Sequence, residues 1–211
     1  MDVHPPHGPI RSVKDFLIHL LAITIGLLIA LSLEAMVEWI HYRHLVHTAK
    51  ANLATEIRGN QQDLTKTLEA LRSSEEQLQH FIKLVHQLEA DRGSPLSQLD
   101  FTWTLATLHD TSWSTAKETG AIAHMDYEEA KRYTAVYALQ LQYNSLQERA
   151  FASANAVSGL TTLLDKDMKR ISESELESSE RTLGLALANT RANEDLARAL
   201  IAEYSQFTGQ K

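Results

Sequence analysis

The stretch from residue 57 to residue 85, IRGNQQDLTKTLEALRSSEEQLQHFIKLV, decides the fold. Its apolar side chains recur every seven residues, at Ile57, Leu64, Leu71, Leu78 and Val85. Because a helix returns to the same face after seven residues, this spacing predicts a long amphipathic helix that packs against other helices. A second row on the same face carries Asn60, Thr67 and Ser74 in its middle. We therefore expect looser packing there, or a polar groove.

Helices continue on both sides of this stretch. Towards the N-terminus, the pattern extends to residue 41. No turn-forming residue separates it there from the preceding apolar segment. Forwards, it ends near residue 90, before the sequence Asp-Arg-Gly-Ser-Pro, which is typical of a helix end. Further helices are predicted over about 96–118, 127–171 and 174–207. No stretch alternates as a strand does, and no proline follows Pro95, so long helices can form there.

The helix predicted over 127–171 has the clearest pattern. One row recurs every seven residues, at Val136, Tyr143, Ala150, Val157, Leu164 and Ile171. The other row lies three residues later, at Leu139, Leu146, Ser153 and Leu160. Short connections make neighbouring helices antiparallel. The predicted fold class is all-α, with an N-terminal transmembrane helix that continues into an elongated antiparallel helical bundle with coiled-coil-like seams.

The apolar segment, FLIHLLAITIGLLIALSL at residues 16–33, contains no formally charged residue. About 20 helical residues cross a bilayer core of about 30 Å, so the span extends to about Ala35. Trp39 then falls at the depth of the membrane interface. The predicted organisation is an N-terminal tail over 1–15, a transmembrane helix and interface over 16–40, and an extramembrane bundle over 41–208.

Two alternatives to a membrane anchor exist. A buried core helix is disfavoured, because such helices seldom keep apolar residues on every face for five turns. A cleaved signal peptide is the stronger rival, since Arg11 and Lys14 precede the segment and Ala30-Leu31-Ser32 fits a cleavage site. Cleavage would leave a secreted soluble bundle. We favour an uncleaved anchor because the apolar run exceeds the usual signal length of about 7 to 15 residues.

Small residues recur along one face of the segment, at Ala22, Gly26 and Ala30, and Glu34 extends this row. Small side chains at this spacing let two helix backbones approach closely in lipid, which predicts a face for membrane-helix association. A carboxylate at the membrane boundary faces a partner helix or water, and an ion path is the less favoured role. The alternative is that Glu34 only marks the headgroup boundary.

Composition excludes several classes of protein. The chain of 211 residues has a net charge of -7, and its basic residues form no cluster, which argues against binding to nucleic acid. It has no cysteine, so it contains neither a disulfide nor a thiolate metal site. No phosphate-binding loop, nucleophile elbow or metalloprotease motif occurs, and we predict no cofactor.

Histidines gather just after the apolar segment. Glu38 precedes His41 by three residues, the spacing of carboxylate and histidine ligands in di-iron bundles, and His44 follows three residues later. A di-iron site needs a second such pair, which the chain lacks. We therefore favour an amphipathic interface belt over a metal site, with a pH sensor built from these histidines as a further hypothesis.

Two stretches resemble an uncharacterised family of single-span bacterial membrane proteins with a helical domain of unknown function. The first is Ile25-Gly26-Leu27-Leu28-Ile29-Ala30-Leu31, followed by Glu34 and then Ala54-Thr55-Glu56-Ile57 with Asn60. The second runs from Trp113 to Ile122, WSTAKETGAI, and is followed by Tyr133 and Tyr137. The resemblance implies a bacterial membrane location and a helical fold, and it implies no activity.

The function predicted from sequence is a membrane-anchored, non-enzymatic bundle that serves assembly, scaffolding or sensing. Its partners are the lipid bilayer and either further copies of the chain or another membrane protein. Its predicted location is the bacterial inner membrane, in a single pass. The flanking charges are nearly balanced, and we favour an N-terminus inside the cell. The alternative function is a metal-binding or enzymatic membrane protein that uses Glu38, His41 and His44.

Overall fold

The computed structural model describes residues 12–91, 101–160 and 171–209. Within these residues the fold is all-α, as predicted, and contains no strand. The elements in chain order are α1 (Val13–Ala90), α2 (Thr111–Glu118), the 3-10 helix η1 (Ala121–His124), α3 (Tyr127–Leu160) and α4 (Glu173–Thr208). The chain divides into two compact units, Met1–Thr48 and Ala49–Lys211.

The predicted continuity of the first long helix is confirmed, because α1 is unbroken from the apolar segment to Ala90. Its buried residues follow the predicted face, including the polar positions in the middle. They are Ala49, Leu53, Ile57, Asn60, Gln61, Leu64, Thr67, Leu71, Ser74, Leu78, Phe81 and Leu88. Val85, the last predicted member of the first row, is half-buried.

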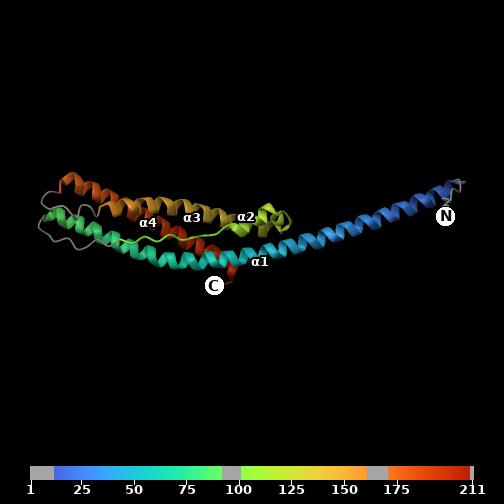
Figure 1. Ribbon diagram of the computed structural model, residues 1–211, viewed down its shortest axis with the longest axis horizontal. Helices are drawn as coiled ribbons and strands as arrows, with labels where there is room; N and C mark the ends of the chain where they lie inside the picture. Colours follow the sequence, from blue (N-terminus) through green and yellow to red (C-terminus); the bar gives the residue numbers. More distant parts are fainter. Residues whose placement is uncertain (1–11, 92–100, 161–170, 210–211) are drawn as a thin grey trace, which may run out of the picture. The chain divides into compact units, whose positions relative to one another are not determined.

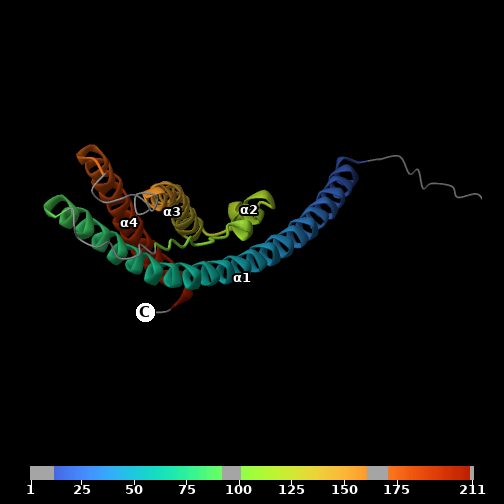
Figure 2. The same ribbon diagram turned by 60° about the vertical axis from the view of Figure 1, so that its left-hand side comes forward.

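In the second unit, α1, α3 and α4 lie side by side, and an extended segment runs between α1 and α3 (Figures 1 and 2). We call residues 101–110 the extended segment. It takes the place that a fourth helix would occupy in a bundle. Because it brings the chain back along α1, the following helix α3 runs in the same direction as α1 and α4 runs against both.

The helix predicted over 96–118 is therefore wrong for most of the part that the structure describes. Residues 96–100 lie outside the described residues, residues 101–110 are not helical, and α2 begins only at Thr111. Side chains from α1 and α3 bond to the backbone of residues 101–110 and take the place of a helix's own hydrogen bonds. The end of α2 is as predicted, since Gly120 adopts a left-handed conformation with φ of 77°.

Helix α3 confirms one of its two predicted rows. Its first row is buried at Val136, Tyr143, Ala150 and Val157. The second row is wrong by one residue: Gln140, Gln147 and Ala154 are buried, whereas Leu139, Leu146, Ser153 and Leu160 are half-buried. The glutamines take these positions because they bond to the extended segment. Positions 161–170, with the predicted Leu164, lie outside the described residues, and Ile171 precedes α4 without being helical.

Helix α4 matches its prediction within a residue at each end. It begins with a capping box, in which the Ser172 hydroxyl accepts from the Glu175 backbone and the Glu175 carboxylate accepts from the Ser172 backbone. Leu183 and Ala186 of α4 pack with Leu78 and Phe81 of α1 and with Val157 of α3 in one core cluster. All three helices therefore contribute to this apolar cluster.

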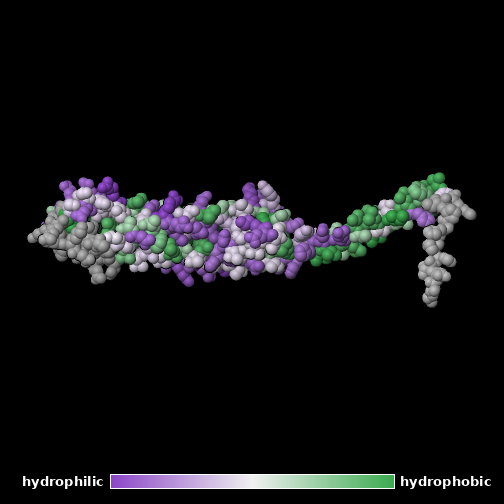
Figure 3. Space-filling model, turned by 45° about the horizontal axis from the view of Figure 1, so that its top comes forward, coloured by the Kyte–Doolittle hydropathy of each residue, from purple (hydrophilic) through white to green (hydrophobic). Residues whose placement is uncertain are grey.

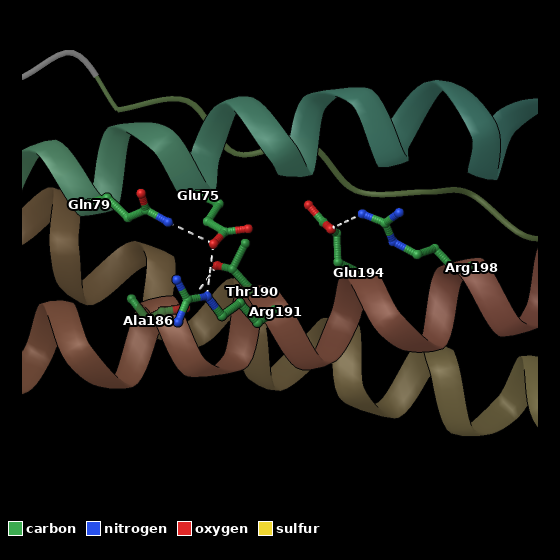
Figure 4. Close-up of polar contacts among 7 residues, drawn as sticks. All are labelled: Glu75, Gln79, Ala186, Thr190, Arg191, Glu194 and Arg198. Carbon is green, nitrogen blue, oxygen red and sulfur yellow. Dashed lines mark hydrogen bonds and ion pairs between the residues drawn. The ribbon is translucent and has the colours of Figure 1, made fainter.

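Polar contacts also join α1 to α4 (Figure 4). Arg191 Nε donates to Glu75 Oε1 at 2.8 Å, and Gln79 donates to the same oxygen at 2.8 Å. One turn further along α4, Arg198 pairs with Glu194 at 2.6 Å. The Arg191–Glu75 pair is partly exposed and contributes little to stability, whereas Glu194 is buried beside the exposed Arg198.

Candidate functional site

The N-terminal part of α1 exposes apolar side chains on every face. Its most apolar eighteen-residue window has no buried residue, and the surface in Figure 3 is hydrophobic along this part of the helix. A core helix of a soluble protein is mostly buried, so this exposure favours a membrane span. One helix of the described residues is thus long and apolar enough to cross a membrane.

The polar side chains of this segment bond to its own backbone. Thr24 donates to the Leu20 carbonyl at 2.8 Å, and Ser32 donates to the Leu28 carbonyl at 2.6 Å. Such bonds satisfy hydroxyl groups without water, as a hydrocarbon environment requires.

The predicted association row lies on an open surface. Ala22, Gly26, Ala30 and Glu34 are all exposed. A methyl group added to Gly26 would meet no atom within 4 Å, so nothing in the described chain fills the space beside it. The face therefore has room for a second helix, and its role in association stays a prediction.

The candidate metal ligands Glu38, His41 and His44 are exposed. Within the described residues, no group of three or more His, Asp or Glu side chains lies close enough together to hold a metal ion. Nearby, the Arg43 guanidinium lies over the Trp39 ring at 5.2 Å, and the His41 ring contacts Tyr42 at 5.6 Å. A cation on an aromatic face is typical of a membrane-interface belt, the role that we favour for this region.

In the second unit, seven side chains of α1 and α3 bond to main-chain atoms of residues 102–112. We call them the polar clamp: Glu56, Asn60, Asp63, Ser74, Gln77, Gln140 and Gln147. The predicted polar groove is therefore real at two of its three positions, Asn60 and Ser74. Thr67 is buried in the same row.

Two amide side chains of the clamp each bind both main-chain groups of one residue. Gln147 accepts from the Ala106 N–H at 2.8 Å and donates to the Ala106 carbonyl at 3.0 Å. Asn60 accepts from the His109 N–H at 2.8 Å and donates to its carbonyl at 2.7 Å. A neighbouring β-strand would satisfy an extended backbone in the same way. The side-chain amides thus supply the hydrogen bonds that a helix would have made within its own backbone.

Glu56 joins the clamp to α2. One carboxylate oxygen accepts from the Ser112 N–H at 2.7 Å, and the other accepts from the Tyr137 hydroxyl at 2.7 Å. The Asp110 side chain makes no capping bond, so Glu56 caps α2 from across the bundle. Trp113 stacks on Tyr137 with 5.0 Å between ring centroids. The two stretches that carry the family resemblance thus meet in space at this point.

Three buried tyrosines surround the clamp. Burial, and then the hydrogen bond to Glu56, raise the pKa of Tyr137 above its ordinary value of 10.0. Burial is also the main cause of the raised pKa of Tyr143 and of Tyr204. Tyr204 donates to Gln140 at 2.6 Å, and Tyr143 donates to Gln147 at 3.0 Å. Each phenol is therefore held protonated.

These tyrosines predict a loss of stability at alkaline pH. Because the folded chain holds each proton more tightly than the unfolded chain, their contribution is complete below about pH 10 and falls as the pH rises above it. We expect the free energy of unfolding in urea to drop steeply between about pH 10 and 12. In Tyr204→Phe the drop should be shallower, and in Tyr127→Phe, at an exposed position, it should not change. An equal drop in both variants would contradict this explanation.

The middle of the bundle keeps a few unpaired polar atoms. Within the described residues, both polar atoms of the Asn193 side chain, the Trp103 indole N–H and Glu194 Oε1 are buried without a hydrogen-bond partner. Asn193 is fully buried and lies near the Tyr143 hydroxyl without hydrogen-bond geometry. Such buried groups without a partner cost stability.

Comparison with other proteins adds no constraint. No protein-family model, curated protein or solved structure matches this chain. The likeness to the single-span bacterial family stays a prediction.

Proposed function

We propose that this chain is a membrane-anchored, non-enzymatic helical-bundle protein that serves assembly or scaffolding. The observation that carries the proposal is the exposed apolar surface on every face of α1 at residues 16–35. Burying this surface in lipid is favourable by about 25 cal/mol per Å², whereas water would leave it exposed. The bilayer is therefore the first partner.

The unbroken course of α1 favours an anchor over a signal peptide. The helix passes through Ala30-Leu31-Ser32 and continues to Ala90 without a turn. The apolar run also exceeds the usual signal-peptide length of about 7 to 15 residues. The family resemblance supports a bacterial membrane as the location. We propose the inner membrane, a single pass and, from the flanking charges, an N-terminus inside the cell.

The buried polar residues of the bundle support a structural role. The amides of Asn60, Gln140 and Gln147 and the carboxylate of Glu56 are engaged with backbone or with tyrosine hydroxyls. A catalytic group needs an atom directed at a substrate, and these atoms are directed at the chain itself. Scaffolding is thus favoured over catalysis.

Assembly through the membrane is the specific form of this function that we propose. The row Ala22, Gly26 and Ala30 allows close contact between two α1 helices in lipid. Replacing Gly26 by Leu is expected to reduce self-association at least several-fold in a membrane dimerisation assay, because the larger side chain separates the backbones. Thr24→Leu, two residues away and on another face, is the control and should retain association. Equal association of both variants would remove this row from the proposal.

A further inference from the structure

A row of uncharged residues on α1 leads from the predicted association face to two histidines. Its members follow one another in steps of four and three residues, the spacing that keeps one face of a helix against a parallel partner. They are Gly26, Ala30, Leu33, Val37, Ile40, His44 and His47, and we call them the pairing row. Every one of them is exposed. The row therefore extends the face at Gly26 and Ala30 past the end of the apolar segment.

The absence of charge on the pairing row suits a second copy of the same chain. In a parallel two-fold pair each residue meets its own counterpart, so a charged residue on the row would face a like charge. The charged residues between positions 26 and 47 are Glu34, Glu38 and Arg43, and all of them lie off the row. The Arg43 guanidinium is held over the Trp39 ring at 5.2 Å. Another copy is therefore the occupant that the row fits.

The row stays apolar beyond the predicted span. Val37 is 63% exposed and Ile40 is 53% exposed, although both follow Ala35, where the span is expected to end. Removing such side chains from water is favourable by about 25 cal/mol per Å². Contact between two copies would bury both side chains, so the pairing gains stability from residues outside the hydrocarbon core as well.

Pairing along this row brings four imidazoles together. His44 and His47 are three residues apart and therefore lie on one face of the helix, so each copy supplies two rings. Neither side chain has a partner within the described residues. His44 follows Ala35 by about 14 Å along the helix, which places the rings in water outside the hydrocarbon core. One chain alone supplies too few ligands, in agreement with the lack of any three-residue metal cluster in the described part of the chain.

Four imidazoles are a ligand set for a transition-metal ion. Zn²⁺ takes four ligands in a tetrahedral arrangement and binds imidazole nitrogen at about 2.0–2.1 Å. Ca²⁺ and Mg²⁺ prefer oxygen ligands, which the pairing row does not offer. The donor atoms therefore favour Zn²⁺ over these hard cations.

We infer that two copies of this chain bind one Zn²⁺ ion through His44 and His47 of both copies, and that the ion strengthens their assembly. The inference rests on the proposed function, because it requires two α1 helices to pair through Gly26 and Ala30. It differs from a metal site within one chain, since only the pair completes the ligand set.

The absence of cysteine allows the pairing row to be tested by cross-linking. Ile40→Cys places a thiol on the row, and His41→Cys places one at the next position, off the row. Both positions are exposed. After mild oxidation in membranes, we expect the disulfide-linked dimer to be at least about five times more abundant with Ile40→Cys. Equal linking at the two positions would contradict pairing along this row.

Zinc binding is measured on the full chain in mild detergent, after metal has been removed with EDTA. On addition of Zn²⁺, we expect one ion per two chains by native mass spectrometry and a dimer dissociation constant lower by about ten-fold or more. The double variant His44→Ala with His47→Ala should lose both effects, and it should stay folded because alanine suits an exposed helix position. His41→Ala, off the row, is the control and should keep both effects. Equal zinc binding by the double variant, or a dissociation constant that zinc does not change, would overturn the site.

The two proposals fail separately. If Gly26→Leu leaves the association of the zinc-free protein unchanged, the proposed assembly row is wrong and the zinc site is wrong with it. If association depends on Gly26 and zinc neither binds at one ion per two chains nor strengthens the dimer, the assembly stands and the zinc site is wrong.

Discussion

Replacing Gln147 by Met is expected to lower the free energy of unfolding by about 3 kcal/mol. Methionine fills nearly the same volume and suits a helix, so the change removes hydrogen bonds with little change in packing. It leaves the Ala106 N–H, the Ala106 carbonyl and the Tyr143 hydroxyl without their partner. For a chain of this size, the midpoint of thermal unfolding should fall by roughly 6–12 °C, measured by circular dichroism.

Gln142→Met is the matched control for this change. Gln142 lies on the same helix, is exposed, and receives the same substitution. Its unfolding midpoint should stay within about 2 °C of the unchanged protein, since exposed substitutions have small effects. If both variants melted alike, the clamp would contribute nothing to holding the extended segment.

Introducing arginine at both Leu21 and Leu28 is expected to remove the protein from the membrane fraction. Each arginine near the middle of a membrane helix costs about 2.5–3.5 kcal/mol, so the pair costs about 5–7 kcal/mol. Both leucines are more than half exposed in the structure, so the substitutions disrupt no packing within the chain. Sedimentation of membranes after carbonate washing measures the effect.

The control for the arginine pair introduces the same charges on the bundle. Leu141 and Leu185 are exposed leucines of α3 and α4, at 68% and 60%. Leu141→Arg with Leu185→Arg should leave the protein in the membrane, because these side chains face water. Loss of both double variants from the membrane would show that charge alone disturbs the protein, and not charge within a lipid-facing segment.

Helices were predictable from this sequence because apolar spacing is a local signal. The row from Ile57 to Leu78 is buried as expected, and α4 begins at Glu173, one residue before its predicted start. The same reasoning placed the buried polar row at Asn60 and Ser74, although it left open what the row faces. Periodicity identifies the face of a helix that is buried, and it does not identify the element that covers it.

The extended segment was missed because its conformation depends on distant residues. The Thr107 N–H and the Ala106 carbonyl bond to Asp63 and Gln147, which lie 44 and 41 residues away in the sequence. The sequence did contain one signal of the extended segment, namely Gln140 and Gln147, which are seven residues apart. Two amides on one face of α3 can bond to the backbone of a neighbouring segment that is not helical. A rule based on apolar residues chose their neighbours Leu139 and Leu146 instead.

The two parts of the candidate site also differ in how far the sequence predicts them. Exposure of the apolar segment follows from its composition, so the sequence alone predicts it. The meeting of Glu56, Ser112 and Tyr137 joins three regions of the chain and depends on the bundle register, which no local pattern contains.

The intact mass of the protein released from membranes by mild detergent tests the central claim most directly. The anchor predicts that the mass includes the whole apolar segment, residues 16–33, and that the protein is found in the membrane fraction. A shorter chain that begins near Leu33 and is found in the soluble fraction would contradict the anchor. It would make this protein a secreted helical bundle.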